Sequence, residues 1–188
     1  MTTLTPANQL TLLRMLLIPA FVILVVYGHL GWALAVFVTA GVTDALDGLI
    51  ARWSGQKTSL GAWLDPMADK LLLVTTFVVL TIPSLNLSNP LPLWLTIMII
   101  SRDVVIVATV AIVNLAIGPR TFRPSVWGKI ATGTYICTAV AAMLFNYLGY
   151  HSAVVDLGVW VSLAITLVSA FHYIWHARGI INAPAGTT

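Results

Sequence analysis

Four aspartates lie close together in this sequence and have the chemistry of metal ligands. Asp44, Asp47, Asp65 and Asp69 fall within residues 44–69 of a chain that contains no glutamate. Four like charges cannot share a small volume unless cations neutralise them. Oxygen ligands without His or Cys favour Mg²⁺ or Mn²⁺ over zinc. We therefore expect these acids to hold two such ions, which would clamp a diphosphate and stabilise charge during displacement at phosphorus.

The spacing of the acids places them on two helices that form an antiparallel hairpin. Residues three, four, seven or eight apart share one face of a helix. The first helix carries Asp44, Asp47, Gly48 and Ala51 on one face, and the second carries Gly61, Asp65 and Asp69. Counted outward from Gln56 in the turn, the two pairs of acids lie at matching depths. The hairpin should therefore let the four carboxylates converge between its helices.

The composition indicates that these helices lie in a membrane. The chain is 59% hydrophobic and 8% charged, whereas a soluble domain has about 25% charged residues. A water-soluble fold is therefore excluded, and each membrane span needs about 20 mostly apolar residues. We expect an all-α fold in which residues 1–188 form a single membrane domain. The apolar runs predict six transmembrane helices at 11–28, 32–53, 61–82, 93–117, 126–148 and 155–177.

The Lys and Arg residues predict the orientation of the helices. They gather near the N-terminus, in the loops after the second and fourth runs and after the last run, and the other loops contain none. This alternation places both termini and the aspartates on the cytoplasmic side of a multi-pass protein, as in a bacterial-type inner or plasma membrane. No signal peptide is expected, because residues 1–8 lack a basic segment. The net charge of +3 favours anionic lipid, and no nucleic-acid partner is expected.

The acids also belong to a longer pattern that resembles a family signature. The pattern is Asp44-x2-Asp47-Gly48-x2-Ala51-Arg52-x8-Gly61-x3-Asp65-x3-Asp69. It matches in full the signature of the CDP-alcohol phosphotransferase (phosphatidyltransferase) family. That family has a six-helix membrane core with the motif on its second and third helices, so the resemblance extends over the whole chain. Dimers are common in the family, which leaves a homodimer open.

The resemblance implies an enzyme of phospholipid biosynthesis. Such an enzyme transfers a phosphatidyl group from CDP-diacylglycerol to an alcohol and releases CMP. By this similarity Asp44, Asp47 and Asp65 would bind the metal pair, and Asp69 would be the general base and touch one metal. The CDP moiety would contact Asn8, Thr11, Gly48, Ala51, Arg52 and Thr58. Asn8 has a second interpretation, as the cap of the first helix.

Basic residues in the second half of the chain bear on the acceptor. The residues concerned are Arg102, Arg120, Arg123 and Lys129. They are either a buried Arg102–Asp103 pair with ordinary cytoplasmic charges, or a pocket whose guanidinium groups bind an acceptor phosphate. Residues 64–70 resemble the branch of the family that contains the phosphatidylglycerophosphate synthases and the eukaryotic-type cardiolipin synthases. Of the acceptors that these enzymes use, we favour glycerol 3-phosphate. Asp103 leans towards the cardiolipin synthases, which makes phosphatidylglycerol the alternative acceptor.

An ion transporter is the remote alternative to an enzyme. A transport path needs ionisable groups through the full thickness of the membrane. In this chain the carboxylates cluster in the predicted cytoplasmic half, and the outer half holds only Asp156. The distribution therefore favours the enzyme.

Overall fold

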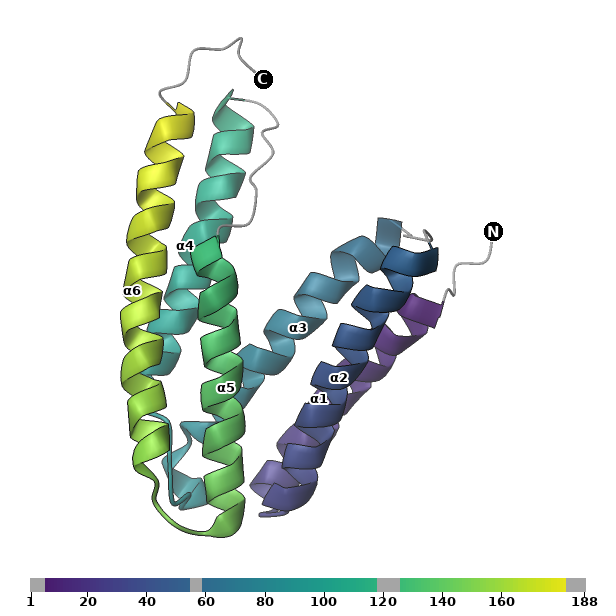
Figure 1. The fold of residues 1–188 in the computed structure, drawn as a ribbon, viewed down its shortest axis with the longest axis vertical. Helices are drawn as coiled ribbons and strands as arrows, with labels where there is room; N and C mark the ends of the chain where they lie inside the picture. The colour runs from purple at the N-terminus through teal and green to yellow at the C-terminus, as the bar shows by residue number, and fades with distance from the viewer. Residues whose placement is uncertain (1–5, 55–58, 118–125, 182–188) are drawn as a thin grey trace. The chain divides into compact units, whose positions relative to one another are not determined.

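The computed structural model is all-helical over the residues that it describes, 6–54, 59–117 and 126–181 (Figure 1). The helices are α1 (Pro6–Val26), α2 (Leu30–Ser54), α3 (Ser59–Leu80), the 3-10 helix η1 (Pro83–Leu85), α4 (Leu93–Ile117), α5 (Val126–Leu148) and α6 (Ala153–Ile181). The predicted all-α fold is confirmed, and α4 and α5 have the predicted bounds. The first helix begins at Pro6 instead of residue 11, because proline suits the first helical turn, where its missing N–H is not needed.

Glycines end two of the helices. Gly28 has φ of 77° and Gly149 has φ of 78°, in the left-handed region that favours residues without a side chain. After α1 the amide of His29 donates to the carbonyl of Leu24 at 2.8 Å, and that of Gly28 donates to Val25 at 3.0 Å. This pair of bonds is a Schellman motif, which satisfies the last carbonyls of the helix. The turn from α1 to α2 therefore follows from the sequence at residue 28.

The chain divides into two compact units. The first unit consists of residues 1–91 and 139–152. In it α1 packs against both α2 and α3, and the rings of Phe21 and Phe37 lie 6.0 Å apart. The apolar core of this unit includes Phe21, Val25, Ala33, Phe37, Ala40, Leu72, Phe77 and Leu80. α1 is thus the common partner of the two helices that carry the motif.

Two buried asparagines form a hydrogen-bond network in the first unit. The backbone N–H of Asn89 donates to Oδ1 of Asn146 at 2.6 Å, and Nδ2 of Asn146 donates to the backbone carbonyl of Asn89 at 3.2 Å. The Asn89 side chain also accepts from the Ser152 amide and donates to the Tyr150 carbonyl, both at 2.8 Å. Both asparagines are buried. Their polar groups satisfy one another, which removes the penalty of burying them.

The second unit consists of residues 92–138 and 153–188. In it α4 packs along α6, and the rings of Trp94 and Trp160 lie 6.0 Å apart. Its interior mixes apolar side chains with hydroxyl groups, among them Leu95, Ile99, Ala131, Tyr135, Thr138, Val159, Ser162, Thr166 and Ser169. Small hydroxyl residues let helices approach closely and bond across their contact.

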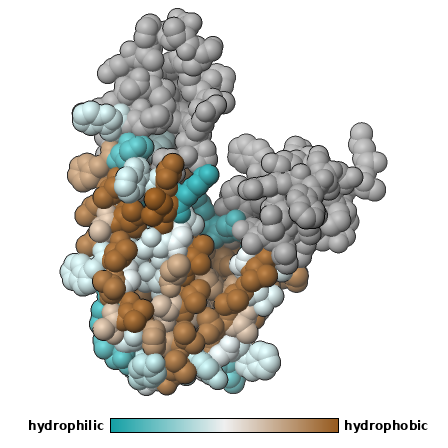
Figure 2. Space-filling model, viewed as in Figure 1, coloured by the Kyte–Doolittle hydropathy of each residue, from teal (hydrophilic) through white to brown (hydrophobic). Residues whose placement is uncertain are grey.

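Apolar side chains also cover much of the surface that Figure 2 shows. Large hydrophobic residues are exposed on every long helix, for example Leu16, Trp32, Leu71, Leu115, Trp160 and Trp175. Within the described part of the chain two helices are long and apolar enough to cross a membrane, Val126–Leu148 and Ala153–Tyr173. The described apolar stretches of α1 and α2, Thr11–Val26 and Leu30–Thr43, are shorter. The six long helices that the sequence predicted are present in the described part of the chain. Of these, α5 and α6 contain the two stretches that meet the criterion for a membrane span.

Candidate active site

The motif lies on two consecutive helices that both pack against α1. Asp44 and Asp47 lie on α2, and Asp65 and Asp69 lie on α3. The side chains of Asp44, Asp47 and Asp65 fall outside the described residues, so their convergence stays a prediction. The same holds for Gly48, Ala51 and Arg52 on α2, and for the whole of Thr58. Among the described side chains no group of three His, Cys, Asp or Glu could hold a metal ion.

Asp69 forms an ion pair that the sequence did not reveal. Nη1 of Arg14 on α1 donates to Oδ1 of Asp69 on α3, between residues 55 positions apart. The side chain of Arg14 is 1% exposed and that of Asp69 is 43% exposed. From the sequence alone, Arg14, the basic residue near the N-terminus, indicated only membrane orientation. The available signal was a charged residue within an apolar run, which indicates a function by itself.

The other N-terminal candidates lie on the same helix as Arg14. Thr11 is fully buried, one turn before Arg14 on the same face of α1. Asn8 lies inside the first turn of α1, which begins at Pro6, so the alternative that it caps the helix is wrong. The side chain of Asn8 falls outside the described residues. Of the N-terminal candidates, Thr11 is therefore the one whose described side chain lies one turn from Arg14 of the ion pair.

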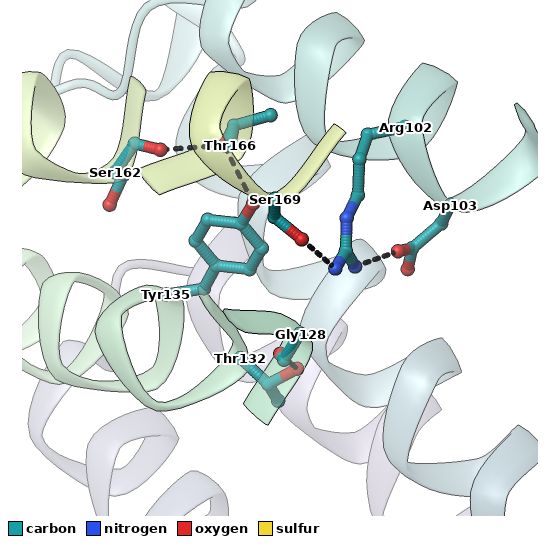
Figure 3. A network of polar contacts seen from close by, with 8 residues as sticks. All are labelled: Arg102, Asp103, Gly128, Thr132, Tyr135, Ser162, Thr166 and Ser169. Carbon is teal, nitrogen blue, oxygen red and sulfur yellow. Dashed lines mark hydrogen bonds and ion pairs between the residues drawn. The ribbon is translucent and has the colours of Figure 1, made fainter. Parts of the chain in front are cut away.

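A second Arg–Asp pair lies in the other unit and is drawn in Figure 3. Nη1 of Arg102 donates to Oδ1 of Asp103 at 2.7 Å, and Nη2 donates to Oγ of Ser169 on α6 at 2.6 Å. The side chains of Arg102 and Asp103 are 9% and 21% exposed. Within the described part of the chain Nε of Arg102 is buried and has no hydrogen-bond partner. A buried donor of this kind is costly, so it marks a place where an additional acceptor would be stabilising.

Hydroxyl groups continue the polar interior along α5 and α6 (Figure 3). The hydroxyl groups of Tyr135 and Thr166 lie 2.6 Å apart, and those of Thr138 and Ser162 lie 3.0 Å apart. Thr138 also donates to the Gly158 carbonyl at 3.2 Å. All these hydroxyl residues are buried. The bonds hold α5 and α6 in register, and sequence reasoning assigned these residues no role.

The predicted basic pocket is described only in part. The side chain of Arg102 is largely buried and contacts Asp103 and Ser169, while Lys129 is exposed near the start of α5. Arg120 and Arg123 fall outside the described residues. Of the two interpretations, the Arg102–Asp103 ion pair is present in the structure. The binding of a phosphate stays a prediction.

Comparison with known proteins identifies the family. Residues 4–172 match the sequence profile of CDP-alcohol phosphatidyltransferases. The chain belongs to the CDP-alcohol phosphatidyltransferase family, which confirms the resemblance that its motif indicated.

Relatives in this family carry two different names. The chain is 32% identical to the human protein "Cardiolipin synthase (CMP-forming)", over 95% of this chain and 63% of that relative. It is 33% identical to the rat protein of the same name, over 97% of this chain and 64% of the relative. It is 36% identical to the Mycobacterium tuberculosis protein "Probable phosphatidylglycerophosphate synthase", over 74% of this chain and 64% of the relative. The chain thus spans less than two thirds of the length of each of these relatives.

Proposed function

We propose that this chain transfers the phosphatidyl group of CDP-diacylglycerol to the hydroxyl group of a phosphate-bearing alcohol and releases CMP. The observation that carries the proposal is the complete family motif on two consecutive helices, α2 and α3. Asp69, the last acid of the motif, presents a carboxylate that is 43% exposed. A base must reach the hydroxyl proton of its substrate, and this exposure gives it access.

Two divalent ions would belong to such a site. The four motif acids offer oxygen ligands only, which fits Mg²⁺ or Mn²⁺. When bound between Asp44, Asp47, Asp65 and Asp69, the ions would supply charge neutralisation of the diphosphate. We propose Asp44, Asp47 and Asp65 as ligands, with Asp69 touching one ion.

The residues of the chain would divide the remaining work. Asp69 accepts the proton of the acceptor hydroxyl while that oxygen forms a bond to the phosphorus of the phosphatidyl group. The bond from this phosphorus to the bridging oxygen breaks, and CMP leaves with the bonding electrons. Asn8, Thr11, Gly48, Ala51, Arg52 and Thr58 would hold the CDP moiety. The reaction is balanced, because the proton gained by Asp69 is returned to solvent.

Glycerol 3-phosphate is the acceptor that we favour. Arg102 keeps a buried Nε without a hydrogen-bond partner in the described part of the chain, and guanidinium groups bind phosphate through paired donors. Arg120, Arg123 and Lys129 would add positive charge. A cationic acceptor such as choline would be repelled by this set.

Phosphatidylglycerol is the second candidate acceptor. Asp103 directly follows Arg102 and forms an ion pair with it at 2.7 Å, and this sequence leans towards cardiolipin synthases. The human and rat relatives that align over most of this chain carry the cardiolipin synthase name. Phosphatidylglycerol also bears a phosphate, so the same arginine suits it.

The enzyme would be a single multi-pass membrane domain with its site at the cytoplasmic side. Large apolar residues are exposed on all six long helices, while several threonine, serine and asparagine side chains are buried. That distribution suits lipid as the surrounding solvent. The family match over residues 4–172 favours one domain. The alternation of basic loops supports cytoplasmic termini.

An acceptor panel tests the proposal. Purified protein receives CDP-diacylglycerol and Mg²⁺ with glycerol 3-phosphate, phosphatidylglycerol or choline, and CMP release is measured. We expect release with glycerol 3-phosphate and none with choline; release with phosphatidylglycerol alone would select the second candidate. The variant Asp65→Asn should lose both Mn²⁺ binding and activity. Wild-type protein that releases no CMP with any of the acceptors would contradict the enzyme.

A further inference from the structure

We propose that Arg14 is a positioning residue for Asp69, a role that rests on the proposed function of Asp69 as the base. Arg14 reaches from α1 to α3 and binds one oxygen of the Asp69 carboxylate, Oδ1. A carboxylate offers two oxygens with about four acceptor sites, so the group can accept from more than one donor at a time. Arg14 would hold the carboxylate in one orientation while its other oxygen, Oδ2, takes the proton of the acceptor hydroxyl.

The unequal burial of the two partners separates their roles. Arg14 is 1% exposed and Asp69 is 43% exposed, so a substrate can touch the carboxylate but not the guanidinium group. Arg14 therefore acts through Asp69 and not on the substrate directly. The acidic partner lies at the accessible end of the pair, where chemistry can occur.

The choice of arginine suits a positioning role. Its guanidinium group stays charged under all physiological conditions and is planar, so it offers Oδ1 of Asp69 a donor of fixed direction. The side chain stands on the buried face of α1 beside Thr11, and α1 packs against both α2 and α3. The guanidinium is thus held by packing, which is what the precise placement of a reacting group requires.

The proposal also explains why a positive charge is buried among apolar helices. A buried charge is retained only when it is paired, because taking it out of water is costly. In the first unit Arg14 pairs with Asp69, which is one of the four acids that we predict to cluster. It would neutralise part of their repulsion before any divalent ion binds.

Kinetics of Arg14→Lys and Arg14→Met provide the first test. We expect kcat of Arg14→Met to fall by about 100-fold, because a small misplacement of a reacting group costs about that much. Arg14→Lys keeps the charge but not the planar fork, so we expect it to recover part of the loss, leaving a fall of about 10-fold. KM for CDP-diacylglycerol and for the acceptor should stay within about threefold, since Arg14 does not contact substrate.

Asn146→Ala is the matched control for a loss of structure alone. Asn146 is also buried in the first unit, and its side chain makes two hydrogen bonds to Asn89. We expect it to lower the thermal midpoint while kcat per folded molecule stays within about twofold. The positioning role would be overturned if the activity of Arg14→Met fell only in proportion to its folded fraction, as we expect for the Asn146→Ala control.

A second readout uses no substrate or metal. Thermal unfolding is measured in chelator for Arg14→Met, Asp69→Asn and the double variant. We expect the double variant to unfold closer to the wild type than the sum of the single shifts predicts, because the two side chains interact directly in the wild type. Strict additivity would overturn the pairing.

The tests also separate this role from the proposed function. Wild-type protein that releases no CMP with any acceptor overturns the enzyme and the role of Arg14 together. An active wild type together with Arg14→Met that retains kcat within threefold overturns the positioning role alone.

Discussion

Each unit contains an arginine–aspartate pair, and the two pairs are built differently. In the first unit Arg14 and Asp69 come from α1 and α3 and are 55 positions apart. In the second unit Arg102 and Asp103 are neighbours on α4, and Ser169 on α6 provides the link to another helix. The first pair thus joins two helices through its charges, while the second is local and reaches its neighbour through a hydroxyl group.

Exposure shows what each arrangement can do. The first pair buries its cation and exposes its acid, with side chains 1% and 43% exposed. In the second pair both side chains are largely enclosed, with Arg102 9% and Asp103 21% exposed, and the arginine also donates to Ser169. An accessible carboxylate suits proton transfer, and an arginine that donates to more than one acceptor suits the binding of an anion. The same two residue types therefore fit different tasks.

The largest expected effect separates the two acids. Asp69→Asn should lower kcat by about 1000-fold while substrate binding survives, since a positioned base contributes about 10²–10⁴-fold. Asp103→Asn should cost no more than about 10-fold, because Arg102 keeps its bond to Ser169. Single-turnover CMP release at saturating substrate measures both. Near-normal release by Asp69→Asn would mean that Asp69 is not the base.

The next effect concerns stability without metal. Asp69→Ala should destabilise the protein by about 2 kcal/mol, because it removes a counter-charge from the deeply buried Arg14. This cost is below that of a fully buried pair because water screens the Asp69 carboxylate, whose side chain is 43% exposed. Asp103→Ala should cost about 1 kcal/mol. Unfolding of the two variants in detergent and chelator measures the free energy that each has lost. A larger loss for Asp103→Ala than for Asp69→Ala would contradict the difference between the two pairs.

The Arg102 pair should affect acceptor binding. Arg102→Met should raise KM for the phosphate-bearing acceptor by about 10-fold, which corresponds to about 1.4 kcal/mol. KM for CDP-diacylglycerol should not change, because the proposed CDP residues lie in the first 58 residues of the chain and Arg102 is not among them. Initial rates with each substrate varied in turn measure the two constants. An equal rise in both would assign Arg102 to general packing.

The smallest effect compares a close glycine contact in each unit. A Cβ on Gly158 would meet Oγ1 of Thr138 at 3.0 Å, and one on Gly31 would meet the Tyr147 ring at 2.7 Å. Thr138 is buried and bonded to Ser162, whereas Tyr147 is 58% exposed and its ring can move away. Gly158→Ala should therefore destabilise by about 1 kcal/mol. Gly31→Ala should be near neutral, because the exposed Tyr147 ring can move aside; the preference of alanine for a helix, about 1 kcal/mol, applies to both variants. Thermal midpoints test the order.

Local features of the fold were predictable from the sequence. Apolar runs between turn residues located all six helices, and 93–117 and 126–148 matched α4 and α5 at both ends. Gly28 and Gly149 stand in turns with positive φ, which few other residues adopt. The Arg102–Asp103 contact was also expected as one of two alternatives, since adjacent residues need no tertiary structure to meet.

Contacts between distant helices were not predictable in the same way. Three such contacts join residues that are 55, 57 and 67 positions apart: Arg14 with Asp69, Asn89 with Asn146, and Arg102 with Ser169. Helical periodicity assigns a residue to a face of its own helix but does not say which helix that face meets. The sequence by itself determined the helices, the motif and the family. Only the tertiary structure decided that α1 supplies the cation for Asp69, because helix packing, and not spacing along the chain, sets which buried charges become partners.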